Sequence, residues 1–126
     1  MLTRLTPPGS PVPMGPYSPA VITDGFVFVA GQGPLLPGTN EMSLGDIEHE
    51  TRLVIENLKT ILEGSGASLA QVVKVNVYIA NAADFAAMNK VYEEYFGAAK
   101  PVRTTVVCRF VAPIKVEIDC IACTLA

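Results

Sequence analysis

The apolar side chains between residues 44 and 62 recur at the three- and four-residue spacing of a helix with one apolar face. Such a helix is stable only when another element covers that face, so the segment requires a layered fold. The stripe consists of Leu44, Ile47, Thr51, Val54, Ile55, Leu58, Ile61 and Leu62. Most of the charged residues, including His49 and Glu50, are predicted to lie on the opposite, polar face.

Capping residues bound this helix and a second one. Ser43 is predicted to begin the first helix, with Asp46 as a partner similar to that of a capping box, and Gly64 to end it. Asn81 can cap a second helix over residues 82–96. Its predicted buried stripe is Phe85, Met88, Tyr92, Tyr95 and Phe96.

Alternating or continuous apolar runs predict the strands. Residues 71–79 alternate between an apolar and a mixed face. Asp24-Gly25 is a strong hairpin signal. The other predicted strands are 18–23, 26–31, 102–109 and 114–124, with a short additional one possible at 2–5. The last two are expected to form a hairpin with its turn at Ala112-Pro113.

This order of elements predicts an α+β fold in which two helices pack on one face of a single mixed sheet. The whole chain, 1–126, is expected to form one domain. The far face of the sheet would be bare and apolar, and such a face suggests a closed oligomer. The residues assigned to it are Val21, Phe26, Phe28, Val107 and Ile121.

Composition excludes several classes of function. The net charge is −3 and the basic residues are scattered, which argues against nucleic-acid binding. No apolar run approaches the length of about 18 residues that a membrane span needs. The proline-rich N-terminus lacks the apolar region of a signal peptide, so a soluble, cytoplasmic protein is expected.

The three cysteines do not form a metal-site pattern. Cys120 and Cys123 are three apart on a predicted strand, so they point to opposite faces, and Cys108 stands alone. His49 is the only histidine and lies on a polar helix face. Neither a structural zinc site nor serine–histidine or cysteine–histidine catalysis is therefore expected, and no cofactor motif is present.

Charges interrupt the apolar segment 101–118, where burial would be costly. Arg103 can present a planar fork of donors to a carboxylate, with Glu117 as an acid, base or water-positioning group. Alternatively, Arg103 and Glu117 pair across a hairpin and only stabilise it. The spacing favours the second interpretation and leaves the first open. Arg109 and Lys115 are interpreted as solvated charges at the rim.

Several segments together resemble the Rid/YjgF family of reactive-intermediate deaminases, from Gly15 to about Ala122. The similar segments are GPYSPA (15–20), AGQGP (30–34), ENL (56–58), DFAAMNKVYEEYF (84–96), PVRTTVV (101–107) and KVEID (115–119). The resemblance implies a chorismate-mutase-like subunit that assembles as a homotrimer, with sheets around a central barrel and clefts between subunits.

The implied reaction is hydrolysis of 2-aminoacrylate-type enamines and imines (2-iminobutanoate or 2-iminopropanoate) to 2-keto acids and ammonia, without a cofactor or metal. By the same resemblance, Arg103 would bind the substrate carboxylate and Glu117 would orient or activate water. The implied cleft residues are Tyr17, from the neighbouring subunit, together with Gly31, Gln32, Asn89 and Thr105.

Three positions depart from the family pattern: Ala30 replaces a frequent Ser, Thr105 a Cys of some members, and Pro19 a frequent Gln. The carboxylate clamp is retained, while substrate choice is open. Two alternatives to the imine deaminase therefore remain. One is a divergent relative that acts on another carboxylated C–N substrate, and the other is a non-catalytic trimeric binding or interaction module.

Overall fold

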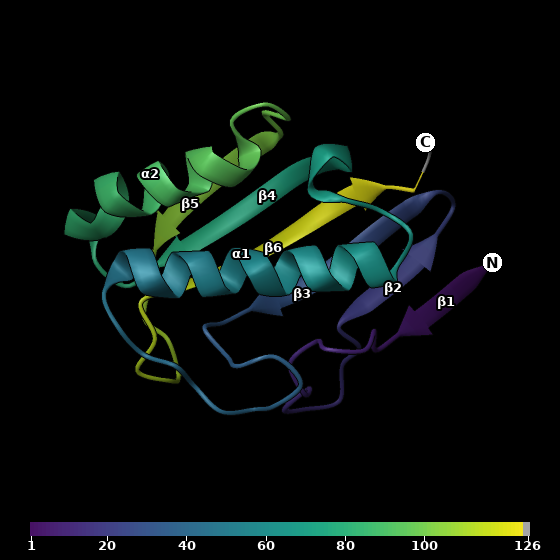
Figure 1. Cartoon of the computed structure of the whole chain (residues 1–126), viewed down its shortest axis with the longest axis horizontal. Coiled ribbons are helices and arrows are strands. Elements are labelled where there is room, and N and C mark those ends of the chain that lie inside the picture. Colours follow the sequence, from purple (N-terminus) through teal and green to yellow (C-terminus); the bar gives the residue numbers. More distant parts are fainter. Residues whose placement is uncertain (125–126) are drawn as a thin grey trace.

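The computed structural model describes residues 1–124, which form one sheet with two α-helices on one side (Figure 1). The last two residues of the predicted domain 1–126 lie outside this range. The strands are β1 (Leu2–Leu5), β2 (Ala20–Thr23), β3 (Phe26–Gln32), β4 (Val72–Ile79), β5 (Val102–Val107) and β6 (Val116–Cys123). The helices are α1 (Ile47–Gly64) and α2 (Phe85–Phe96), with 3₁₀ turns η1 (Leu69–Gln71) and η2 (Ala82–Asp84).

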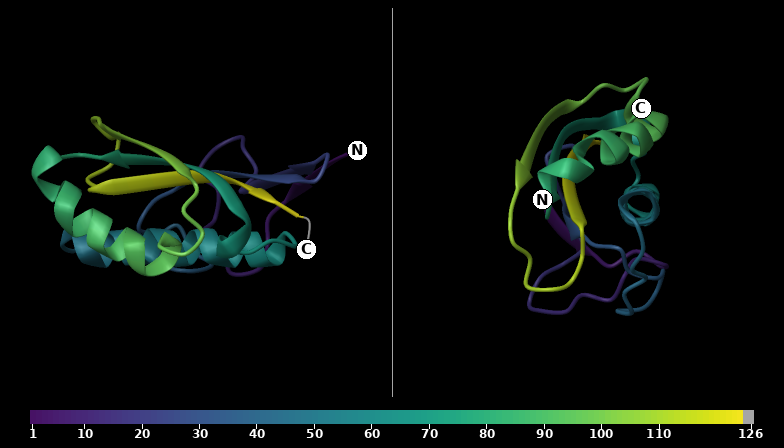
Figure 2. Two further views of the ribbon diagram at one scale, coloured as in Figure 1. Left: turned by 90° about the horizontal axis from the view of Figure 1, so that it is seen from above. Right: turned by 90° about the vertical axis from the view of Figure 1, so that its left-hand side faces the viewer.

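The strands lie in the order β1-β2-β3-β6-β4-β5. Neighbours are antiparallel except β4 and β5, which are parallel, so the sheet is mixed. Both helices lie on the same side of it, and the two views of Figure 2 show these two layers. The predicted α+β class, the mixed sheet and the single helical layer are confirmed.

The predicted hairpin between the last two strands is wrong. β6 lies between β3 and β4, and β5 lies at the sheet edge beyond β4. The connection passes the end of β4, where the Cys108 N–H donates to Ile79 O at 2.9 Å and the Ala80 N–H donates to Lys115 O at 3.0 Å. This insertion gives the apolar strand β4 hydrogen-bonding neighbours on both edges, as suits a central strand.

α1 begins three residues later than predicted. Asp46, not Ser43, is the N-cap, and its carboxylate accepts the His49 N–H at 2.8 Å. Ser43 Oγ lies 3.0 Å from Nε2 of His49 instead. Leu44 therefore stays outside the helix and is exposed, whereas the stripe from Ile47 onward is buried as predicted.

The core fills the space between the sheet and the helices, with Leu58 of α1 and Val77 of β4 fully buried. The opposite face of the sheet is bare, and Phe26 and Phe28 are about two-fifths exposed on it, at 41% and 42%. One assignment to this face is wrong: Val107 is in register with Ile79, whose side chain points to the helices.

None of the helices within residues 1–124 combines the length and apolar character needed to cross a membrane.

Candidate active site

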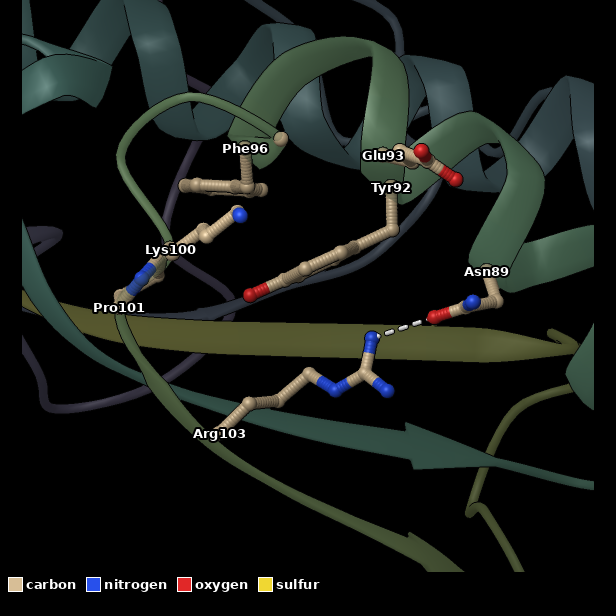
Figure 3. Close-up of a pocket in the computed structure, with 8 residues that line it drawn as sticks. Asn89, Tyr92, Glu93, Phe96, Lys100, Pro101 and Arg103 are labelled. Atoms are coloured by element: carbon tan, nitrogen blue, oxygen red, sulfur yellow. Dashed lines mark hydrogen bonds between the residues drawn. The ribbon is translucent and has the colours of Figure 1, made fainter.

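Arg103 points from the edge strand β5 toward helix α2. It is in register with the buried Val75, which places its side chain on the helical side of the sheet. Nη1 donates to Asn89 Oδ1 at 2.7 Å (Figure 3). The guanidinium carbon lies 4.6 Å from the centre of the Tyr92 ring and 5.6 Å from that of Phe85. Two aromatic rings and one amide therefore fix the guanidinium.

No carboxylate neutralises this guanidinium within residues 1–124, because none lies within 4.0 Å of it. The predicted alternative of an Arg103–Glu117 pair across a hairpin is therefore wrong within the chain. Arg103 borders an open cavity of about 310 Å³. The cavity is lined by Asn89, Tyr92, Glu93, Phe96, Gly97, Lys100, Pro101 and Arg103. An oriented, uncompensated cation beside open space is suited to binding an anion.

Tyr92 was not among the predicted site residues. Its ring stacks on Phe96, with ring centres 4.6 Å apart, and it lies beneath the guanidinium. Burial raises the pKa of its hydroxyl despite the nearby Arg103 charge, so the ring stays neutral. The available signal was its spacing of three residues from Asn89, which places both on one helix face.

Glu117 lies on the other side of the sheet. It is opposite Tyr78 in the β6–β4 register and half-buried on the bare face. With Tyr17, Ala30 and Gly31 it lines an open cavity of about 300 Å³. Burial first, and then the charge of Asp119, raises the pKa of this carboxyl above its usual value. Such a group is suited to exchanging a proton with water or substrate.

Gly31 lets the chain approach Glu117 closely. A β-carbon at this position would lie 2.9 Å from Cδ of Glu117 and closer still to Oε2, so any larger residue would displace the Glu117 carboxyl from its place. The pairing of β3 with β6 is irregular between Val29 and Gln32, which places Gly31 in this irregular segment. Gln32 is buried, and its side-chain amide donates to Ala30 O at 3.1 Å. This bond stabilises the backbone at Ala30, which lines the Glu117 cavity.

Tyr17 and Thr105 occupy different surroundings. Tyr17 is half exposed, its hydroxyl accepts the Met14 N–H at 3.2 Å, and it lines the Glu117 cavity. Thr105 follows Arg103 by two residues on the helical side of β5. Its hydroxyl is buried without a hydrogen-bond partner among the described residues. A role for Thr105 in binding stays a prediction.

Asp119 organises the bare face next to Glu117. Its two carboxylate oxygens accept hydrogen bonds from the Asn76 amide and the Tyr78 hydroxyl, each at 2.9 Å. The second bond is the largest cause of the raised pKa of Tyr78. Asp119 is therefore held in place as the fixed charge that favours a protonated Glu117.

The predicted position of Glu50 on the polar face of α1 is wrong. Glu50 is fully buried rather than on the polar face, and its Oε1 accepts the Lys115 N–H at 2.7 Å.

His49 is exposed, as predicted. Cys120 and Cys123 lie on opposite faces, as predicted, and burial raises the pKa of Cys120 to about 12. No cluster of three or more metal-ligating acids, histidines or cysteines occurs within residues 1–124.

The chain therefore presents two candidate half-sites. One is the Arg103 guanidinium beside α2, and the other is the Glu117 carboxyl, with its raised pKa, on the bare face.

Residues 8–124 match the family described as Endoribonuclease L-PSP. A RutC family protein of Pyrococcus abyssi is 52% identical over 114 residues, covering 90% of each chain. A protein of Dermatophagoides farinae named 2-iminobutanoate/2-iminopropanoate deaminase is 41% identical, covering 93% of this chain and 92% of its own.

Solved structures agree with these matches. Escherichia coli TdcF with bound serine superimposes with a TM-score of 0.88 at 33% identity, over 96% of this chain and 98% of that one. The chain belongs to the Endoribonuclease L-PSP family, also called the Rid/YjgF family, which includes imine deaminases.

Proposed function

We propose that this protein hydrolyses 2-aminoacrylate-type enamines and imines, 2-iminobutanoate or 2-iminopropanoate, to 2-keto acids and ammonia. The observation that carries this proposal is the Arg103 guanidinium, held by Asn89 at 2.7 Å and stacked on Tyr92, with no acid partner within residues 1–124. The name of the Dermatophagoides farinae relative, at 41% identity, supports the same activity.

The chemistry needs few groups. A protonated imine, R–C(=NH₂⁺)–COO⁻, takes up one water and yields R–CO–COO⁻ and NH₄⁺. Water adds to the imine carbon, which is already electrophilic, and the C–N bond then breaks. Arg103 binds the carboxylate and Glu117 accepts a proton from the water, then returns it to the departing nitrogen. We propose no cofactor or metal for this reaction.

The two half-sites require a second copy of the chain. Arg103 lies on the helical side of the sheet and Glu117 on the bare side, so one small molecule cannot touch both within one chain. We propose a homotrimer in which the bare faces, with Phe26 and Phe28, surround a central barrel. Arg103 and Asn89 of one copy would then face Tyr17, Gly31 and Glu117 of the next.

A coupled assay tests the proposed reaction. A threonine dehydratase releases 2-iminobutanoate, and the wild-type protein should accelerate formation of 2-oxobutanoate over buffer alone. Arg103→Ala should abolish the acceleration while the oligomer, measured by light scattering, stays intact. Equal rates with wild type and buffer would reject the proposal.

Two further measurements separate the alternatives. A divergent relative, suggested by Ala30 in place of a serine, would turn over a different carboxylated C–N compound in a substrate panel. A non-catalytic module would bind 2-keto acids without turnover and would tolerate Glu117→Gln. A net charge of −3 without a basic stripe speaks against an RNA substrate.

A further inference from the structure

A second positively charged residue, Lys100, borders the same open cavity as Arg103. Three residues of chain span at most about 11 Å, so one small molecule can reach both side chains. Figure 3 shows Lys100 extending toward the rings of Phe96 and Tyr92, while the Arg103 guanidinium lies on the other side of Tyr92. The two positive groups therefore border one space, with the Tyr92 ring between them.

Lys100 has no acid partner within residues 1–124, because no carboxylate lies within 4.0 Å of its ammonium group. Glu93 is the only acid that lines the cavity, and its exposed side chain points away from Lys100 (Figure 3). Arg103 likewise has no acid partner. In a chain with a net charge of −3, this local excess of positive charge favours an anionic ligand.

The backbone holds Lys100 in a conformation that is unfavourable for lysine. Its φ is 47°, in the left-handed region that glycine adopts without strain. The Lys100 N–H donates to Phe96 O at 2.9 Å, and Pro101 restricts the chain directly after it. A lysine kept at a position that suits glycine points to a use for its side chain.

The size and charge of the cavity define the class of ligand. A volume of about 310 Å³ equals that of roughly ten water molecules in the liquid. A short dicarboxylate such as succinate or glutarate has a similar number of non-hydrogen atoms. One carboxylate would accept hydrogen bonds from the Arg103 guanidinium and the other would pair with the Lys100 ammonium group, with the methylene groups over the Tyr92 ring.

We infer that Arg103 and Lys100 together bind a short dicarboxylate, such as succinate or glutarate, across this cavity. The inference rests on the contact between Arg103 and a carboxylate that the proposed function also uses, and it does not depend on turnover. Because the dicarboxylate occupies the Arg103 guanidinium, it competes with the substrate of the proposed reaction. Lys100 then distinguishes anions of two charges from anions of one.

The test compares each dicarboxylate with its monoamide by calorimetry, succinate with succinamate and glutarate with glutaramate. The two members of a pair have nearly the same size and differ by one charge. Wild type should bind the dicarboxylate roughly three- to fivefold more tightly, the gain expected from one further ion pair at an open site. Lys100→Met should remove this preference. Lys90→Met, at an exposed position of α2 outside the cavity, should leave the preference unaltered.

A second substitution separates binding from a structural role of Lys100. Lys100→Gly should melt at a higher temperature than wild type, because glycine adopts a φ of 47° without strain, and it should still lose the preference. A lowered melting temperature with an unchanged preference would assign Lys100 to the turn alone and overturn the inference.

Other results separate this inference from the proposed function. Equal binding of dicarboxylate and monoamide by wild type, with imine hydrolysis intact in the coupled assay, would overturn the dicarboxylate site and leave the function standing. A preference that depends on Lys100, in a protein that turns over no imine, would support the site and reject the function. Absence of binding by every carboxylate would overturn the site and remove the contact on which the function also rests.

Discussion

Arg103 and Glu117 lie on opposite faces of one sheet, separated by strand β4. Arg103 is in register with Val75 and Glu117 with Tyr78, and these two β4 residues are three positions apart. Residues an odd number apart on a strand point to opposite faces, so the two charged groups cannot meet within a chain. The arrangement supports a site completed by a second copy.

Tyr92 should position Arg103 through its ring and not its hydroxyl. Tyr92→Leu removes the face that lies 4.6 Å from the guanidinium carbon, and should raise KM roughly three- to thirtyfold with a smaller change in kcat. Tyr92→Phe should retain both constants. Because the hydroxyl is buried without a partner among the described residues, Tyr92→Phe should also unfold at a higher temperature. A loss of activity in Tyr92→Phe equal to that in Tyr92→Leu would contradict this role.

Glu117 should set the acid side of the pH–rate profile. Its pKa is raised above 4.5, chiefly by burial, so the carboxylate is lost on acidification earlier than for an ordinary glutamate. The fall in kcat/KM should therefore be centred above pH 4.5. Asp119→Asn removes the second cause of the shift and should move this midpoint to lower pH. An unmoved midpoint would assign the titration to another group.

The raised pKa of Glu117 also predicts an effect on stability with a definite sign. The folded chain holds this proton more tightly than the unfolded chain, so stability falls as pH rises from the unfolded value through the folded one. Glu117→Gln should lack this loss and be more stable than wild type at pH 7. Urea unfolding should show the difference shrinking toward pH 4, and a constant difference would refute the explanation.

Gly31→Ala should impair activity without unfolding the protein. The new methyl group would meet the end of the Glu117 side chain, which can move aside at small cost, but the carboxylate then leaves its place. We expect kcat to fall roughly tenfold or more, with little change in melting temperature. Combined with Glu117→Ala, the glycine substitution should add nothing, and additive losses would show that Gly31 acts otherwise.

Glu50→Leu should destabilise the chain by about 3 kcal/mol, because the backbone N–H groups of Lys115 and Gly45 lose a buried acceptor. Urea denaturation measures this loss. Glu48→Leu, at a half-exposed position on the same helix, is the matched control and should change stability by less than about 1 kcal/mol. Equal effects of the two substitutions would contradict the assigned role of Glu50.

The periodicity of the sequence was sufficient to predict both α-helices and the strands β2 to β6, but not the 3₁₀ turns η1 and η2. Periodicity and the boundary residues Asp24-Gly25 and Gly64 are local properties, and the structure confirms the elements that they bound. The start of α1 was missed because Ser43 and Asp46 are both good caps, and only the contact with His49 shows which one is used.

The neighbours of β5 and β6 could not be predicted from spacing. A connection between residues 107 and 116 is short enough for a hairpin, but the backbone bonds of Cys108 and Ala80 route the chain past β4. Alternation along the strand places Arg103 and Thr105 on one face of β5. Whether that face lies on the helical or the bare side of the sheet depends on the strand order, which is a long-range property.

The individual site residues were predicted mainly through family resemblance, and their surroundings were not. Glu50 was wrongly predicted to lie on the polar face of α1. Its burial depends on a backbone donor, the Lys115 N–H, which is 65 residues away in the sequence. Tyr92 was predicted to be a core residue, and only the tertiary structure shows that Arg103 stacks on it.

Mixing two inactive variants tests the central claim most directly, namely that Arg103 of one copy acts with Glu117 of another. Arg103→Ala and Glu117→Gln are unfolded and refolded together in equal amounts, and imine hydrolysis is measured. In a homotrimer with three sites between subunits, about a quarter of the sites regain both groups, so about a quarter of the wild-type activity should return. Mixed oligomers without any recovered activity would contradict the account.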